Sequence, residues 1–164
     1  MAYRAGAELV NMEYTGTSAM SKDYNGPGLS TYIRHDGHLV NSLGERFLEK
    51  YAPNLMERAP AGIRYQAVLN EINEGRGPVY FKLSHLPEDT LDVIEEGVFT
   101  VERPTMKQFY ESRGTDIRKD LIEIRLSEVY MEGGHGMAGL ATNEKAETSI
   151  KGLYAAGDVV ANPY

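Results

Sequence analysis

The residues best suited to chemistry lie between Gly133 and Asp158, where two glycine turns enclose a polar, hairpin-like middle. The first turn is GGHG at 133–136, and the second is the Gly-Asp pair at 157–158. Small and apolar residues at 152–156 precede the second turn, a pattern typical of a buried strand whose end lets another molecule approach its backbone. A carboxylate there can accept hydrogen bonds from the hydroxyl groups of a ligand. We interpret this stretch as part of a ligand site.

The chain has no cysteine, so we expect no disulfide, no thiolate nucleophile and no iron–sulfur or zinc–thiolate site of its own. Its four histidines are His35, His38, His85 and His135. They lack the spacing of metal-binding motifs, and we expect no metal site. Any redox chemistry would therefore depend on an organic cofactor.

Length and charge limit the class of protein. The 164 residues are enough for one domain with a core, or for a piece of something larger. A net charge of −7 argues against a broad surface for nucleic acid or anionic membrane. No apolar run approaches the ~20 residues that span a bilayer. The sequence also lacks an amino-terminal signal pattern, so we expect a cytoplasmic protein.

Spacing of apolar residues and of helix breakers predicts several helices. They cover residues 2–10, 45–51, 61–74, 86–96 and 104–113. In the strongest of them, Tyr65, Val68, Leu69 and Ile72 form a single apolar stripe. Arg64 lies beside this stripe in the first turn, where it either faces solvent or points into a cleft.

Extended segments are predicted at 79–83, at 121–130 and on both sides of a hairpin-like 141–149. The Asp36-Gly37 pair between 29–33 and 38–40 favours a further β-hairpin. Asn41 and Ser42 are expected to cap the helix at 45–51, which Pro53 ends.

Four strings occur in the order found in fumarate reductase and succinate dehydrogenase flavoproteins, which the chain resembles over nearly its whole length. The strings are AYRAGAEL at 2–9, GERF with YAP at 44–47 and 51–53, EGRG at 74–77, and KGLYAAGD at 151–158. Within that superfamily, segments 22–27, 74–80 and 133–135 are most similar to the adenylylsulfate reductase flavoprotein.

The resemblance implies an α+β fold and FAD as cofactor. Residues 21–125 would form a mobile capping domain, and residues 1–20 and 126–164 would be edges of a Rossmann-type FAD domain, truncated at the end. The family's phosphate-binding GxGxxG motif does not occur in this sequence. We therefore expect an internal fragment of an FAD-dependent oxidoreductase that is inactive in isolation and does not hold FAD well by itself.

Cofactor-binding residues follow from matching positions. Asp158, after Gly157, matches the acidic residue that holds the ribityl hydroxyls of the flavin in the family. Gly133 and Gly134 match a turn beside the isoalloxazine ring, where a Cβ would crowd the ligand. His135 follows this turn directly, as a histidine does in the sulfate-reducing branch.

The substrate residues of fumarate reductases are replaced here. Their His-Pro-Thr string corresponds to YTG at 14–16, their second histidine to Val129, and their proton-donating arginine to Ala61. Two basic residues remain for the same roles. Arg64 and His135 are the candidates to bind an anion and to stabilise charge as hydride moves.

The resemblance thus implies hydride transfer between flavin and a small anionic substrate, and a further partner would be an iron–sulfur electron-transfer subunit. One alternative is an adenylylsulfate reductase-like flavoprotein subunit, which would need such a partner because this chain has no cysteine. Another is a non-catalytic α+β interaction module whose glycines serve only turns.

Overall fold

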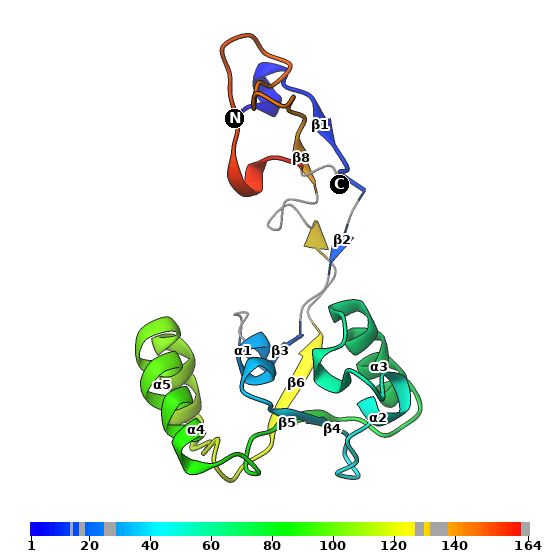
Figure 1. Cartoon of the computed structure of the whole chain (residues 1–164), viewed down its shortest axis with the longest axis vertical. Helices are drawn as coiled ribbons and strands as arrows, with labels where there is room; N and C mark the ends of the chain where they lie inside the picture. The colour runs from blue at the N-terminus through cyan, green and yellow to red at the C-terminus, as the bar shows by residue number, and fades with distance from the viewer. Residues whose placement is uncertain (14, 17–18, 25–28, 127–129, 132–137, 162–164) are drawn as a thin grey trace. The chain divides into compact units, whose positions relative to one another are not determined.

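A computed structural model of the chain describes residues 1–13, 15–16, 19–24, 29–126, 130–131 and 138–161. The chain divides into two compact units. Unit 1 consists of Met1–Thr17 with Glu128–Tyr164, and unit 2 of Ser18–Ser127. Helices and strands occur together in the chain, which confirms the expected mixture of α and β structure (Figure 1).

Unit 2 is built on a four-stranded antiparallel sheet in the order β3-β6-β5-β4. Its strands are β3 (Ala19–Ser21), β6 (Ile122–Leu126), β5 (Val79–Lys82) and β4 (His38–Val40). Burial alternates along the central strands, because successive side chains of a strand point to opposite faces. Val79 opposite Ile124 and Phe81 opposite Ile122 are buried on the core face.

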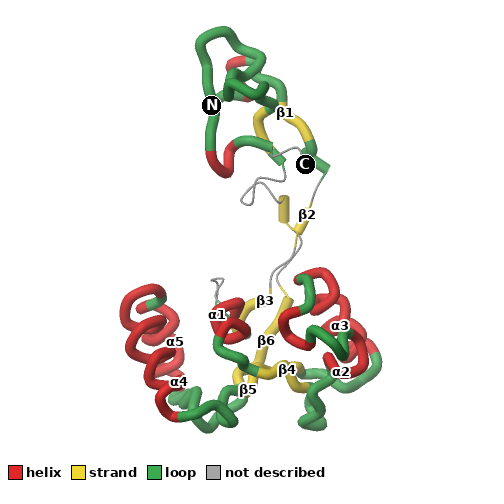
Figure 2. Tube along the Cα trace, in the orientation of Figure 1, coloured by secondary structure: helices red, strands yellow, loops and turns green. Residues whose placement is uncertain are grey.

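Helices pack around this sheet (Figures 1 and 2). They are α1 (Leu29–Arg34), α2 (Leu48–Tyr51), η2 (Met56–Arg58), α3 (Ala61–Asn73), α4 (Glu88–Asp92), the π-helix η3 (Val93–Glu102) and α5 (Pro104–Arg113). In the view of Figure 1, α2 and α3 lie to the right of β6, and α4 and α5 to its left. The bounds of α3 and α5 lie within one residue of their predictions.

The core of unit 2 is aromatic at its centre. Tyr32 is fully buried, with its ring centroid 5.6 Å from that of Phe81 and 6.4 Å from that of Phe99. Its hydroxyl donates hydrogen bonds to the hydroxyl of Tyr110 and to the sulfur of Met106. Burying such a side chain stabilises a fold by about 1.5–3 kcal/mol, and the hydrogen bonds offset the cost of removing the hydroxyl from water.

The predicted hairpin around Asp36 and Gly37 is wrong. Residues 29–34 form helix α1, and the Asp-Gly pair ends it: Asp36 has φ 60°, and the Gly37 N–H donates to the Tyr32 carbonyl at 2.8 Å. A Cβ on Gly37 would lie 2.9 Å from that carbonyl oxygen. Gly37 therefore allows a tight helix end, and a turn between two strands has the same local signature.

The helix predicted at 45–51 is only the four residues of α2. Asn41 builds a turn in front of it instead of capping it. Its side-chain oxygen accepts the N–H groups of Leu43 and Glu45, both at 3.0 Å. The first predicted helix is likewise shortened to the 3-10 turn η1 (Tyr3–Ala5), because Gly6 takes φ 93° and the chain then enters a strand.

The buried face of α3 differs from the predicted stripe. Val68 is buried, but Leu69 and Ile72 are exposed, and Ala67 and Glu71 lie on the buried face in their place. Counting apolar residues missed this arrangement, because a carboxylate that is paired and hydrogen-bonded can be buried as completely as a leucine.

Unit 1 consists largely of loops (Figure 2). Its short elements are η1, β1 (Leu9–Val10), β2 (Thr15–Gly16), β7 (Tyr130–Met131), β8 (Gly139–Leu140) and the 3-10 turn η5 (Gly157–Val159). β1 pairs antiparallel with β8, and β2 pairs antiparallel with β7. A small apolar cluster of Ala7, Leu140 and Ala155 forms its core.

Two antiparallel pairs flank the points where the chain passes between the units. On the unit 1 side, Thr15 is opposite Met131. On the unit 2 side, Ala19 is opposite Leu126. The first and last strands of unit 2 are thus hydrogen-bonded to each other.

Candidate functional site

Asp158 lies in the 3-10 turn η5, directly after a backbone that only glycine adopts easily. Gly157 has φ 75°, which favours glycine because a Cβ is strained there. The Asp158 side chain is exposed, and within the described residues no hydrogen bond or ion pair engages its carboxylate. Both carboxylate oxygens are therefore available to accept hydrogen bonds from a ligand.

Short backbone contacts fix the position of this turn. The Val160 N–H donates to the Gly157 carbonyl at 3.0 Å, and the Ala161 N–H donates to the Leu140 carbonyl at 3.1 Å. β8 thereby lies between β1 and the segment after η5, with which it forms a parallel bridge from Leu140 to Val160.

Gly139 allows this close approach. A Cβ on Gly139 would lie 2.3 Å from the Val159 carbonyl oxygen and 3.1 Å from the Ala161 nitrogen, both backbone atoms. Any other residue would push the Asp158 turn away from β8. The sequence analysis did not single out Gly139, because a lone glycine in a short strand does not reveal what packs beside it.

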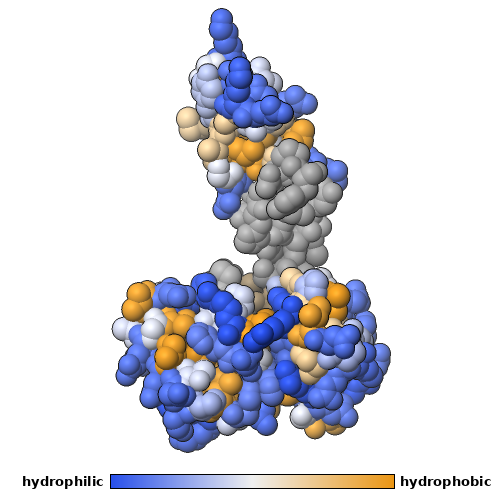
Figure 3. Space-filling model, viewed as in Figure 1, coloured by the Kyte–Doolittle hydropathy of each residue, from blue (hydrophilic) through white to orange (hydrophobic). Residues whose placement is uncertain are grey.

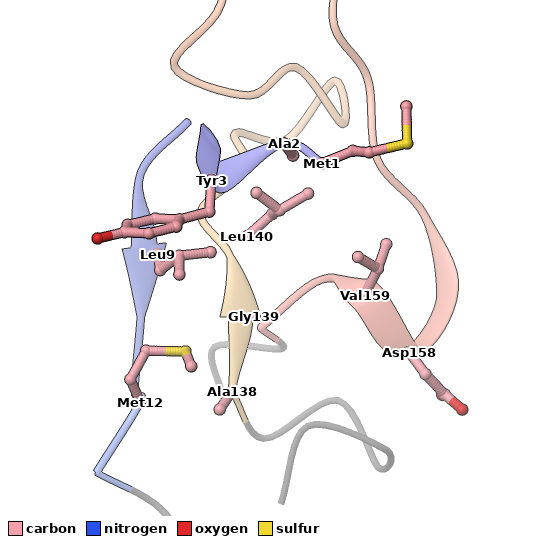
Figure 4. Close-up of a pocket in the computed structure, with 10 residues that line it drawn as sticks. All are labelled: Met1, Ala2, Tyr3, Leu9, Met12, Ala138, Gly139, Leu140, Asp158 and Val159. Carbon is pink, nitrogen blue, oxygen red and sulfur yellow. The ribbon is translucent and has the colours of Figure 1, made fainter. Parts of the chain in front are cut away.

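Beside η5 lies a mainly apolar hollow with a volume of about 390 Å³ (Figure 4). It is lined by Met1, Ala2, Tyr3, Leu9, Met12, Ala138, Gly139, Leu140, Asp158 and Val159. In Figure 4 the Asp158 carboxylate points away from Leu9 and Tyr3. Figure 3 shows hydrophobic residues gathered on the visible face of unit 1. Unit 1 thus combines an apolar surface with one unengaged carboxylate, which suits an amphipathic ligand.

Arg64 belongs to unit 2, in the first turn of α3, and is half-buried. Its Nη1 donates to the carbonyl oxygens of Glu57, at 3.2 Å, and Ala59. Among the described residues, no carboxylate forms an ion pair with Arg64. The guanidinium is therefore held in place by backbone carbonyls while its positive charge is not neutralised by a side chain.

Two buried carboxylates of unit 2 were missed by the sequence analysis. Glu57 accepts the Leu39 N–H at 3.0 Å and is held by two nitrogens of Arg46. Burial would raise the pKa of Glu57, but the hydrogen bonds from Arg46 and from backbone N–H groups outweigh it and lower that pKa below its usual value. The GERF string, which contains Arg46, was a signal for this pair.

Glu71 has no exposed surface and four hydrogen-bond donors around its carboxylate. Arg76 donates through Nε at 2.6 Å and Nη2 at 2.7 Å, Asn41 at 2.9 Å and the Tyr51 hydroxyl at 2.9 Å. The hydrogen bonds from Arg76, followed by those from Asn41 and Tyr51, outweigh the effect of burial and lower the pKa of Glu71 to about 2. This cluster explains the second string of the resemblance, EGRG, as a structural ion pair.

Three of the predicted site residues lie outside the described part of the chain. They are Gly133, Gly134 and His135. Their predicted roles beside the flavin ring remain predictions, as do the roles of Arg64, Gly157 and Asp158.

Comparison with known proteins identifies the family. The sequence pattern of the FAD binding domain family matches residues 1–164. The chain belongs to this family. Its short strands, glycine turns and exposed carboxylate are thus those of an FAD binding domain.

Relatives of this FAD binding domain include a flavoprotein-family subunit of the fumarate reductase (CoM/CoB) of Methanothermobacter marburgensis, which is 34% identical over 168 residues. The match covers 97% of this chain and 28% of that relative. A solved quinol-fumarate reductase with menaquinol molecules superposes with a TM-score of 0.76 at 26% identity, covering 98% of this chain and 29% of that one.

An adenosine-5-phosphosulfate reductase in complex with sulfite has the same TM-score of 0.76, at 24% identity, covering 99% of this chain and 31% of that one. This likeness shows the fold alone, so the alternative of an adenylylsulfate reductase-like subunit stays a prediction. The chain spans less than a third of each of these proteins. Within the described residues, no helix is long and apolar enough to cross a bilayer.

The site residues described in unit 1 fit the cofactor that the family binds. The exposed Asp158 carboxylate can accept hydrogen bonds from ribityl hydroxyls, and the Gly157 turn presents it without a side chain beside it. FAD is amphipathic, with apolar ring surfaces and a polar chain, and the hollow beside η5 is apolar next to a polar turn.

Proposed function

We propose that this chain is the capping region and the adjoining strands of the FAD domain in an FAD-dependent oxidoreductase that acts on a small anionic substrate. Unit 2 would be the capping domain and unit 1 the part of the FAD domain. The family match over residues 1–164 and the likeness to fumarate reductase flavoproteins support the proposal. An iron–sulfur subunit is the proposed electron-transfer partner.

The observation that carries the proposal is the unengaged carboxylate of Asp158 at a glycine turn. A surface carboxylate has no need of a preceding residue at φ 75° unless the chain must turn tightly beside another group. We assign Asp158 to the ribityl hydroxyls, where it would orient the cofactor by accepting hydrogen bonds.

Arg64 and His135 are the proposed substrate residues. The charge of Arg64 is not neutralised by a carboxylate of the described chain, so an anion can be its counterion. An imidazole at His135 could exchange a proton with the substrate near neutral pH. Bound FAD would supply the hydride acceptor or donor.

The test uses the complete protein and the variant Asp158→Asn. The amide retains one acceptor oxygen but places a donor where the hydroxyls also donate. We expect the dissociation constant of FAD to rise about tenfold, which corresponds to the loss of one charge-assisted hydrogen bond. Flavin fluorescence during titration of the apoprotein measures this constant.

Glu144→Gln is the matched control, since Glu144 is another exposed carboxylate of unit 1. It should leave FAD affinity unchanged. Equal affinity in the Asp158→Asn and Glu144→Gln variants would refute the assignment of Asp158. A second titration, of FAD into the 164-residue chain, should show no tight stoichiometric binding, because the phosphate-binding motif is missing from this sequence.

A further inference from the structure

The guanidinium of Arg64 is held by a very short helix. Its two carbonyl partners, Glu57 and Ala59, belong to η2 and to the residue that ends it. A single 3-10 turn has little rigidity of its own, since it makes few internal hydrogen bonds. Whatever fixes η2 therefore fixes the Arg64 side chain.

The side chain of Glu57 fixes η2 to the rest of unit 2. It is buried, with 5% of its side-chain surface exposed, and its Oε1 accepts the N–H of Leu39, a core residue of β4, at 3.0 Å. The other contacts come from Arg46, whose Nε lies 3.0 Å from Oε1 and 3.2 Å from Oε2. A bidentate pair of this kind restricts orientation as well as distance.

Glu57 thus holds Arg64 through two bonded steps. Its carboxylate is fixed to the sheet and to Arg46, and its own backbone carbonyl accepts from Arg64 Nη1 at 3.2 Å. Nothing in hydride chemistry requires a buried Glu-Arg pair at this place. Alignment of a nearby cation does, because a displacement of about 1 Å weakens a charge-assisted contact strongly.

We infer that Glu57, clamped by Arg46, is a positioning residue that orients Arg64 toward a small carboxylate-bearing ligand. This inference rests on the proposed function, in which Arg64 binds the anionic substrate. It also explains the GERF string, since Arg46 supplies the clamp and the η2 backbone connects the ion pair to Arg64.

The test measures binding of malonate, a small dicarboxylate, to the complete FAD-loaded protein by the change in flavin absorbance. Glu57→Gln keeps the size of the side chain but faces the donors of Arg46 with an amide N–H. We expect it to raise the dissociation constant of malonate about tenfold, and Arg64→Ala to raise it at least as much. Arg46→Lys, which keeps the charge without the bidentate geometry, should give a smaller rise.

Glu71→Gln is the matched control, because Glu71 is also a buried carboxylate of unit 2 paired with an arginine but has no contact with Arg64. It should lower the melting temperature at least as much as Glu57→Gln while leaving malonate affinity unchanged. If Glu57→Gln and Glu71→Gln have the same malonate affinity while Arg64→Ala binds weakly, the positioning role is refuted and the proposed function survives. If wild type gives no malonate response, or Arg64→Ala matches wild type, the anion-binding role of Arg64 fails, and this inference with it.

Discussion

Replacing Glu71 with glutamine should destabilise unit 2 substantially. Every hydrogen-bond partner of this carboxylate is a donor, from Arg76, Asn41 and Tyr51. A carboxylate accepts from all of them, whereas a glutamine amide must point its own NH₂ group at one of them. The donor that loses its partner is then buried without compensation.

The size of the effect follows from the pKa of Glu71. A fall from 4.5 in the unfolded chain to about 2 in the folded one corresponds to about 3 kcal/mol of stability. Because the folded pKa is the lower one, this stability is fully present above pH 4.5 and is lost as the pH falls toward 2. Wild type and Glu71→Gln should therefore differ by about 3 kcal/mol at pH 7 and progressively less below pH 4.5.

Urea unfolding of the 164-residue chain, followed by circular dichroism at 222 nm, measures this difference, because the longer helices α3 and α5 belong to unit 2. Glu74→Gln is the control: Glu74 also pairs with Arg76, but 52% of its side chain is exposed. Exposed pairs contribute about 0–1 kcal/mol. A Glu71→Gln variant no less stable than Glu74→Gln, or a difference that stays constant from pH 7 to pH 3, would refute the reasoning.

Two further predictions concern other contacts. Gly139→Ala should place a methyl group against the Val159 carbonyl, cost about 1–3 kcal/mol by overpacking, and weaken FAD retention by the complete protein; flavin release on heating measures this, and unchanged release would show that the Asp158 turn can move freely. Burial and, next, the neighbouring His85 ring, stacked at 3.7 Å, lower the pKa of His38. Its contribution to stability is therefore present above pH 6.5 and lost as the pH falls below it. In an NMR titration, His85→Asn should raise the pKa of His38, and an unchanged value would exclude the stacked ring as a cause.

The sequence predicted elements well where one local signal decides them. Pro104 and Gly114 bound α5 because proline suits a first turn and glycine the left-handed residue after a last one. It failed where two structures share a signal, as at Asp36-Gly37, which suits a hairpin and a helix end equally. Choosing between them depends on Tyr32 and Leu83, and a local window does not show that these residues pack against Gly37.

The candidate site was predictable only in part. Asp158 was identified from its glycine turn, and the structure shows that carboxylate exposed and unengaged. The buried carboxylates Glu57 and Glu71 look like ordinary charged residues in the sequence, because their burial depends on partners five to eighteen positions away or more. Ion pairs between distant segments leave no periodic pattern, so the contact of Arg64 with the η2 carbonyls could not be foreseen.

The pairing of β3 with β6 makes unit 2 a cassette. The strand that opens it and the strand that closes it are neighbours, with Ala19 opposite Leu126, so the host sheet sees one doubled stalk whatever the insert contains. Inserts of different size or chemistry can be exchanged at this stalk without rewiring the surrounding chain. Grafting residues 19–126 from a relative onto the same stalk is accordingly a direct route to new substrate preference on an unaltered flavin scaffold.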